Sequence, residues 1–341
     1  MSDRRILAVD VGRGTQDILI YDPDIPAENS FRLVLPSPTV IVGNAIRSAA
    51  QVGRPVHLEG TCMGGGGSVS AVMAAIGAGL SVTASPEAAP TIHDDPERVQ
   101  RMGVRVTDEP AAGAMRVRTG DYMEEEIRTA LSLFGVTYPE QVAVAVQDHG
   151  YSPKVSNRLH RFEVFRDLLE SGDRDLYALA PDPPHPSMTR MQAVLSGAPG
   201  ALVTDTGPAA AIGALLDPWV AERAGGGITI VNAGNGHTLC FTLRGTCVCG
   251  MFEHHTAALD TPTLKGLIRR LQEGTLTNRE VFDDGGHGAA MYEAVGQTPV
   301  AVTGPNRRRL LPDAWQAAAY GDMMLTGSFG LVEIWKKRRD G

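Results

Sequence analysis

Two segments of the chain share one pattern, in which an apolar run leads into a turn of glycine and small polar residues and a second apolar run follows. The first segment spans residues 6–20 and the second spans residues 228–241. Apolar runs on both sides of a tight turn predict antiparallel strand pairs. Glycine in such a turn leaves backbone N–H groups open to an anion, because no Cβ stands in the way. The two hairpins therefore predict two lobes that clamp one polyphosphate.

Period-two and helical patterns place further elements between and after the hairpins. Strands are predicted at residues 32–35, 55–59, 141–146, 201–204, 246–252 and 300–303. Helices are predicted at residues 40–51, 68–78, 121–134, 157–169, 208–216, 261–271 and 313–322. Residues 81–120 show no interpretable pattern. The proline-rich stretch at residues 181–186 is the best linker signal, so we predict an N-terminal lobe at 1–185 and a C-terminal lobe at 186–341.

Composition narrows the classes of function. The chain of 341 residues carries a formal net charge of −8 and no basic stripe, which argues against nucleic acid as a partner. No apolar run reaches the roughly 18 residues that cross a bilayer, and no secretory h-region precedes the first strand, so we expect a cytoplasmic protein without a membrane partner. The cysteines fit reduced thiols better than a disulfide framework; they are Cys62, Cys240, Cys247 and Cys249.

Five short motifs follow one another in a characteristic order. They are DVGRGT at residues 10–15, VAVQDHG at 144–150, TGPAAAIGAL at 206–215, NAGNGHT at 232–238 and VAVTGP at 300–305. Together they resemble the first phosphate motif, the connecting strand, the chaperone-type helix, the second phosphate motif and the adenosine motif of the actin-like ATPase superfamily. That superfamily includes actin, sugar kinases and heat-shock chaperones. The resemblance implies a two-lobed α/β fold of the ribonuclease H-like type, with a mixed sheet flanked by helices in each lobe and a nucleotide cleft between them.

The resemblance also implies an Mg-ATP site, in which Asp10 would hold Mg²⁺ through water. The residues that would cradle the nucleotide are Gly12, Gly14, Thr15, Asn232, Gly234, Asn235, Gly236, Gly304 and Pro305. Asn232 departs from the family pattern, which usually has an aspartate there. Because an amide supplies an oxygen without a charge, we expect weaker metal binding and doubt fast hydrolysis. A plain hairpin turn, with Asp10 capping backbone N–H groups, is the alternative.

Three residues are candidates for catalysis. Asp148 ends a buried strand that should point into the cleft, where a carboxylate can act as a general base. Gln147 could instead orient an attacking water, as its position resembles the connecting-strand glutamine of actin and sugar kinases. Asp205 is a second candidate carboxylate. The alternative interpretations are a strand-end turn residue for Asp148 and a helix N-cap for Asp205.

Histidines gather in the second half of the chain and define a possible second site. Its candidate members are Glu253, His254, His255 and His287, with His237 nearby in the second turn. Neutral imidazoles and carboxylates can bind a transition metal. Neighbouring residues of a strand point to opposite faces, however, so His254 and His255 should not bind one ion together. A substrate or partner pocket is favoured over a metal site, and a hydrogen-bonded structural cluster stays open as a third interpretation.

Two stretches, residues 10–17 and 253–256, are more closely similar to a bacterial and archaeal family labelled pyruvate formate-lyase activating enzyme. A radical enzyme of that type holds its cluster with three thiolates in a Cys-x3-Cys-x2-Cys loop. Cys240, Cys247 and Cys249 instead follow a Cys-x6-Cys-x-Cys spacing.

We therefore expect an ATP-binding small-molecule kinase or ATPase that uses Mg-ATP. One alternative is an ATP-dependent reactivase or chaperone-like switch acting on a partner protein. The other is a non-hydrolytic nucleotide- or metal-binding protein. Neither the substrate nor the oligomeric state follows from the sequence.

Overall fold

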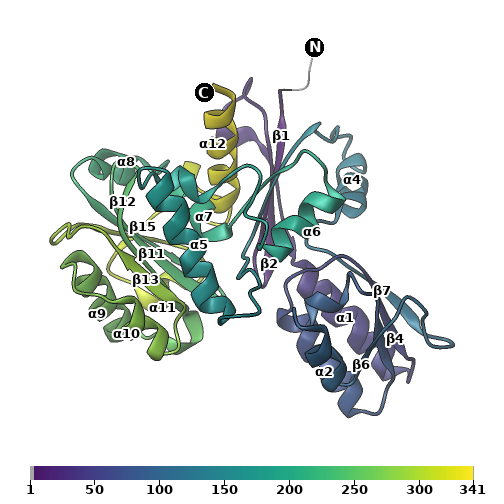
Figure 1. Cartoon of the computed structure of the whole chain (residues 1–341). Coiled ribbons are helices and arrows are strands. Elements are labelled where there is room, and N and C mark those ends of the chain that lie inside the picture. The colour runs from purple at the N-terminus through teal and green to yellow at the C-terminus, as the bar shows by residue number, and fades with distance from the viewer. Residues whose placement is uncertain (1–3, 341) are drawn as a thin grey trace.

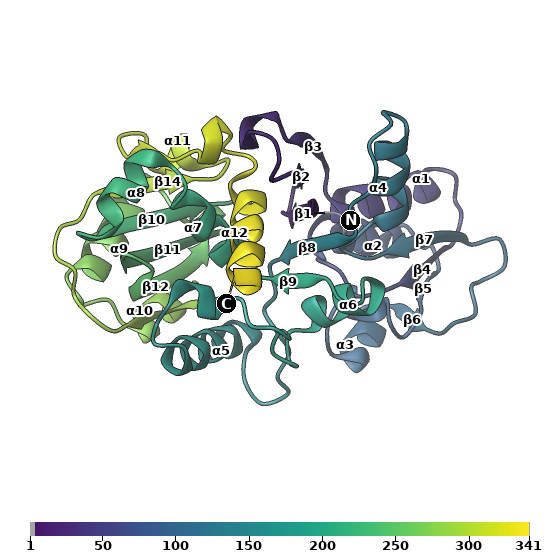
Figure 2. The same ribbon diagram turned by 90° about the horizontal axis from the view of Figure 1, so that it is seen from above.

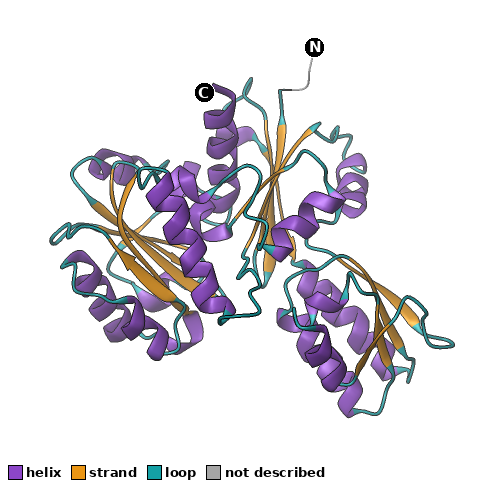
Figure 3. Cartoon of the chain, viewed as in Figure 1, coloured by secondary structure: helices purple, strands orange, loops and turns teal. Residues whose placement is uncertain are grey.

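The computed structural model describes residues 4–340 and contains three β-sheets with helices packed against them (Figures 1 and 3). In spatial order, the central sheet consists of β3 (Phe31–Pro36), β2 (Thr15–Tyr21), β1 (Ile6–Val11), β8 (Gln141–Val146) and β9 (Leu202–Thr204). The second sheet consists of β13 (Gly288–Met291), β12 (Cys247–His255), β11 (His237–Arg244), β10 (Ile228–Ala233), β14 (Val300–Thr303) and β15 (Trp315–Gln316). The small third sheet consists of β6 (Val104–Val106), β5 (Val82–Ala84), β4 (Val56–Gly60) and β7 (Met115–Thr119).

The first two sheets repeat one topology. In the central sheet, β1, β2 and β3 form an antiparallel meander, and β8 and β9 continue from β1 in parallel. In the second sheet, β10, β11 and β12 form the meander and β14 and β15 continue from β10, while β13 adds an edge strand. Each predicted hairpin is thus the start of one duplicated unit. This arrangement confirms the two-lobed α/β fold of the ribonuclease H-like type.

Apolar residues on both faces of β1 explain why it lies in the middle of its sheet. Ile6 and Ala8 pack into one buried cluster, while Leu7 and Val9 pack into another on the opposite face. A strand that is apolar at successive positions is typical of a sheet covered on both sides. Helices on the two faces include α4 (Glu124–Ser132), α5 (Asn157–Ser171) and α6 (Thr189–Gly197).

Two central helices occupy equivalent places in the two units. Helix α7 (Thr206–Ala214) follows β9, and α12 (Thr326–Asp340) follows β15. They pack against each other between the two large sheets (Figure 2). A Cβ at Gly330 would lie 1.8 Å from the backbone oxygen of Ala209, so a glycine at residue 330 lets the two backbones touch. The sequence patterns did not predict α12, whose two faces are both largely buried around Leu331 and Val332.

The small sheet forms a separate layer, inserted between β3 and β8, with α1 (Pro38–Gln51), α2 (Gly66–Gly77) and α3 (Pro96–Arg101) (Figure 1). It accounts for residues 81–120, whose three- to five-residue strands are too short to show a period. The helix predicted at residues 313–322 is wrong, because this stretch forms β15 and the short 3-10 helix Ala319–Gly321. The helix predicted at residues 121–134 is shorter in the structure, where α4 spans Glu124–Ser132, and Phe134 lies beyond its end and is exposed.

The remaining helices belong to the second lobe or its connections: α8 (Pro218–Ala224), α9 (Thr261–Gln272), α10 (Asn278–Asp283) and α11 (Arg307–Leu310). The lobe boundary at residues 185 and 186 stays a prediction. β9, which follows that boundary in sequence, pairs with β8 in the central sheet. Within residues 4–340, no helix combines the length and apolar character needed to cross a membrane.

Candidate functional site

The turns of the two repeated hairpins meet across a cavity of about 740 Å³. A Cβ at Gly14 would lie 3.0 Å from Nδ2 of Asn235, and a Cβ at Gly236 would lie 3.5 Å from Cδ of Arg13. The first turn comes from the central sheet and the second from the six-stranded sheet. One turn from each unit of the duplication therefore lines the cavity, and the two turns contact each other.

Most of the residues singled out in the sequence line this one cavity. They are Asp10, Gly12, Thr15, Gln147, Asp148, Asp205, Asn232, Gly234, Asn235, Gly236, Glu253, His255, His287, Gly304 and Pro305. Two predicted residues stand apart. Gly14 makes the contact between the turns without lining the cavity, and His254 points to the other side of β12, where its Nε2 lies 3.2 Å from Asp284. The functional roles of all these residues remain predictions, but the structure does bring the fifteen cavity-lining residues together around one space.

The first hairpin brings two carboxylates together. Asp10 and Asp17 face each other across the β1–β2 pair, and each has an Oδ1 atom without a hydrogen-bond partner in the described part of the chain. Burial, and then the charge of Asp17, raises the pKa of Asp10 well above its usual range. Gly327 at the start of α12 leaves room for Asp10, since a Cβ there would lie 1.9 Å from Oδ2. Two unpaired carboxylate oxygens at one point are a binding site for a cation or a proton.

The second hairpin is braced by the turn after β14. Gly304 has a φ of +91°, and a Cβ at this position would lie 2.6 Å from the backbone oxygen of Ala233 and 2.9 Å from Oδ1 of Asn232. Asn306 donates its side-chain amide to the backbone oxygen of Gly234 at 3.0 Å. The phosphate and adenosine motifs of the sequence resemblance are thus in direct contact. Only a residue without a Cβ fits this close approach at a positive φ.

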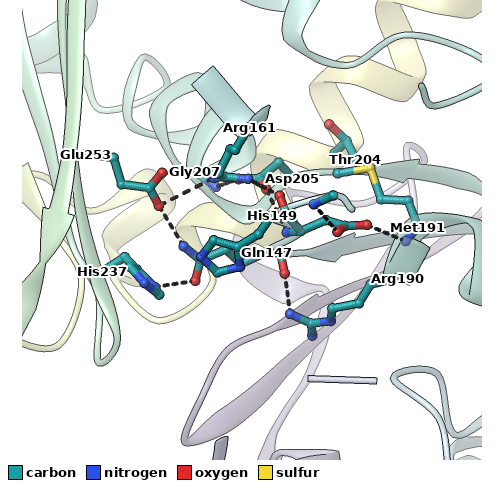
Figure 4. A network of polar contacts seen from close by, with 12 residues as sticks. Gln147, His149, Arg161, Arg190, Met191, Thr204, Asp205, Gly207, His237 and Glu253 are labelled. Atoms are coloured by element: carbon teal, nitrogen blue, oxygen red, sulfur yellow. Dashed lines mark hydrogen bonds and ion pairs between the residues drawn. The ribbon is translucent and has the colours of Figure 1, made fainter. Parts of the chain in front are cut away.

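A buried arginine, Arg161 of α5, holds the floor of the cavity together (Figure 4). Its guanidinium group donates to both oxygens of Asp205, at 2.6 and 2.9 Å, and its Nε donates to Glu253 at 2.7 Å. Burial alone would raise the pKa of Glu253, but the charge of Arg161, the neighbouring His287 and His237 and the hydrogen bond from Arg161 together outweigh burial and hold that pKa well below the usual range. Asp205 also accepts from the backbone N–H of Gly207 and so caps α7, as its alternative interpretation expected.

Asp148 is buried with both carboxylate oxygens engaged. Oδ1 accepts the backbone N–H of Gly150 at 2.8 Å, and Oδ2 accepts that of Met191 at 2.9 Å. Burial raises the pKa of Asp148. The side chain therefore joins the turn after β8 to helix α6. Its role as a general base stays a prediction, and in this geometry a proton taken up by Asp148 would displace one backbone partner.

Replacing Asp148 by asparagine is expected to lower the free energy of unfolding by about 1–3 kcal/mol, because the new amide NH₂ group would face a buried N–H donor. Urea denaturation measures this cost. Asp108→Asn, at an exposed position, serves as the control and should stay within about 0.5 kcal/mol of the parent protein. A D148N protein as stable as the parent would show that these backbone contacts do not matter for the fold.

Four histidines line the same cavity and contact one another; they are His149, His237, His255 and His287. Nε2 of His149 lies 2.8 Å from Nε2 of His287, and the rings of His237 and His255 lie beside them, with centroids 4.7–5.3 Å apart for the contacting pairs. Burial lowers the pKa of His237 to about 4 and that of His287 to about 3. These imidazoles are therefore neutral near pH 7. Glu253, which the sequence grouped with the histidines, adjoins the cluster through Gln147.

The raised pKa of Asp17 predicts that the free energy of unfolding depends on pH. Burial raises its pKa from 3.8 to about 7, so between these values the folded protein keeps a proton that the unfolded chain releases. Since the folded state then binds more protons, the stability that Asp17 contributes falls as the pH rises. An Asp17→Asn variant has no carboxyl group at this position, so its stability does not fall with pH for this reason. Relative to the parent protein, it should gain up to about 1.4 kcal/mol per pH unit between pH 4 and 7, and the difference should level off above.

Urea unfolding of both proteins at several pH values measures that difference. Parallel pH profiles for the parent protein and D17N would contradict the raised pKa.

Several residues of the site were missed from sequence. Arg161 lies in a helix whose pattern predicted only an apolar stripe, and His149 was noted only as part of a motif. Arg190 of α6 forms a bidentate ion pair with Asp121 and also donates a hydrogen bond to the backbone oxygen of Gln147. Asp17 follows the first turn directly and could have been found, because it faces Asp10 once the hairpin register is known.

A family model described as "Putative pyruvate format-lyase activating enzyme (DUF1786)" matches residues 63–309, which is more than half of the chain. The chain belongs to this family. Its cysteines do not form the cluster site that the description suggests: within residues 4–340, the cavity histidines His149, His237 and His287 are the one group of three potential metal ligands. The four thiols are free, and burial raises the pKa of Cys62 to about 12.

No curated protein matches the chain. Among solved structures, the chain is similar to an exopolyphosphatase-like protein, with 9% identity and a TM-score of 0.30 over 89% of this chain and 66% of the other. It is also similar to ROK hexokinase from Thermus thermophilus, with 11% identity and a TM-score of 0.35 over 99% and 100%. A ROK family glucokinase from Streptomyces griseus, solved with glucose and AMPPNP, matches with 12% identity and a TM-score of 0.26 over 72% and 46%. The chain spans less than two thirds of the first and third of these proteins.

Proposed function

We propose that this protein binds Mg-ATP between its lobes and catalyses phosphoryl transfer to a small molecule or to water. The observation that carries the proposal is the contact of the two repeated glycine turns over the cavity, at Gly14 with Asn235 and Gly236 with Arg13. Turns of this kind offer backbone N–H groups to phosphate oxygens, and one from each lobe can hold a polyphosphate from both sides. Arg13 and Arg158 also line the cavity and supply positive charge for an anionic ligand.

The residues around Asp10 fit a magnesium ion. Mg²⁺ prefers hard oxygen ligands and is commonly held by one or two carboxylates together with substrate phosphates. Asp10 and Asp17 line the cavity, and each has a buried carboxylate oxygen without a hydrogen-bond partner in the described part of the chain, so a cation there would take the place of a proton. Asp17 also offers the negative charge that Asn232 lacks. When bound, the ion would neutralise phosphate charge; Asp10 and Asp17 would hold it.

The chain's own residues would position the nucleotide. The turn at Gly304 and Pro305 lies against Ala233 and Asn232, so the adenosine end would sit beside the second phosphate turn. Asp148 is retained as the proposed base and Gln147 as the residue that orients the attacking group. Gln147 is already held at both ends, by His237 and Glu253, which fixes its direction without an added ordering cost.

Thermal unfolding with Mg-ATP, with ADP and with EDTA tests this proposal. A ligand that binds only the folded protein adds about 2.7 kcal/mol of stability at one hundred times its dissociation constant. We expect a clear rise in unfolding temperature with Mg-ATP. No shift at millimolar nucleotide would remove the proposal. If Mg-ATP does raise the unfolding temperature, phosphoryl transfer to candidate alcohols would favour a kinase, whereas stimulation of ATP hydrolysis by a partner protein would favour a switch.

A further inference from the structure

The four-histidine cluster is organised in a way that the proposed nucleotide chemistry does not require. His149 follows β8, His237 begins β11, His255 ends β12 and His287 precedes β13. The side chains come from both lobes and converge on one side of the cavity (Figure 4 shows His149 and His237). One ring nitrogen from each of His149, His237 and His287 lies within 4.8 Å of the other two.

A chain of buried contacts fixes which nitrogen of His237 has a free lone pair. Arg161 donates to Glu253 at 2.7 Å, and a carboxylate paired with a guanidinium group accepts hydrogen bonds, so the amide NH₂ of Gln147 donates to it at 2.6 Å. The amide oxygen of Gln147 therefore faces His237, whose Nδ1 lies 2.6 Å away and must carry the proton. Nε2 of His237 is left as a Lewis base. Metal-binding histidines in proteins are held in this way, with the other ring N–H donated to an oxygen.

His149 and His287 bring two further ring nitrogens into contact. A hydrogen bond between their two Nε2 atoms needs a proton on one of them. A bound cation would take the place of that shared proton and join both lone pairs. Behind the cluster, one guanidinium group faces the two carboxylates of Asp205 and Glu253, and this excess of negative charge favours a cation.

We propose that His149, His237 and His287 form a site for a divalent transition metal of the zinc class, with His255 as the nearest further donor. Imidazole ligands suit zinc, and three of them with an open position are a known arrangement for a zinc ion that binds water or an anion. Ligand nitrogens about 2.0 Å from zinc lie about 3.3 Å apart in a tetrahedron. The 2.8 Å separation of His149 and His287 needs only a small opening to reach this value. The open position would face the cavity, which all four histidines line.

Metal binding to the full-length protein, stripped with EDTA and dialysed against Zn²⁺, tests the site. We expect one bound Zn²⁺ per chain, and Co²⁺ in its place should give the visible absorption of a tetrahedral complex. His287→Ala should lose binding. Because His287 is fully buried and its variant could fail to fold, His237→Gln is the second variant, with an expected loss of at least tenfold in affinity. Gln147→Leu, which removes the contact that positions His237 together with the hydrogen bond to Glu253, should weaken binding by about 10- to 100-fold.

His185→Gln, at an exposed histidine outside the cluster, is the matched control and should bind Zn²⁺ like the parent protein. Clearly substoichiometric zinc in the parent protein, or unchanged affinity in the folded H237Q variant, would overturn the site. If the protein binds zinc but Mg-ATP does not change its thermal unfolding, the zinc site is supported and the proposed function is contradicted. If Mg-ATP stabilises the protein but zinc does not bind, the proposed function is supported and the zinc site is contradicted.

Discussion

Replacing Arg161 by methionine is expected to lower the free energy of unfolding by about 3–5 kcal/mol, the largest stability effect predicted for any single residue of this site. Arg161 is fully buried and pairs with Asp205 and Glu253, both of which are buried as well. Without the guanidinium group, two carboxylates remain in a medium of low polarity with no cation to compensate them. The loss also frees Gln147, because Glu253 no longer has a fixed position.

Urea denaturation with an unchanged m-value measures this loss. Arg116→Met, which removes an exposed ion pair with Glu59, is the control and should cost no more than about 1 kcal/mol. Adding Glu253→Gln to Arg161→Met should recover part of the stability, since it removes one of the two uncompensated charges. A cost below 1 kcal/mol for R161M, equal to the surface control, would contradict the network described around α5.

Replacing Asp10 by asparagine is expected to weaken Mg-ATP binding by roughly 100-fold or more and to abolish turnover, while the folded protein keeps its stability. The weaker binding and the unchanged stability have the same physical cause. The carboxylate of Asp10 has an unpaired oxygen and a raised pKa, so its charge is unfavourable for the fold and available for a cation. An amide keeps the shape and removes that charge. We expect the unliganded variant to be as stable as the parent protein or slightly more stable.

Calorimetric titration with Mg-ATP, together with thermal unfolding of the unliganded protein, separates binding from stability. Asp24→Asn, an exposed aspartate beyond the end of β2, is the control and should bind Mg-ATP normally. If D10N matches the parent protein in nucleotide affinity and turnover, the first hairpin is not the phosphate site. A large loss of stability in D10N would instead show that Asp10 is mainly a structural residue.

The hairpins could be predicted from sequence because the information for them is local. An apolar run on each side of a glycine turn, all within about fifteen positions, predicts the two strands and the turn between them. Those two hairpins, the motif order and the strand at 300–303 sufficed to predict a two-lobed fold and a cleft between the lobes. Helix α12 escaped the same reasoning because it is buried on most sides, and a helix buried all round shows no amphipathic stripe.

The candidate site divides in the same way. By itself, the sequence determined where the two glycine turns lie and which residues, such as Asp10 and Gly236, stand in them, while their contact with a ligand stays a prediction. Only the tertiary structure decided that Asp17 joins Asp10, that Asp148 is held by two backbone groups, and that Arg161 lies beneath the cavity. It also brought His149 to the cluster from more than eighty residues away in sequence. Such groupings depend on how distant strands pack, and a pattern of neighbouring residues carries no information about that packing.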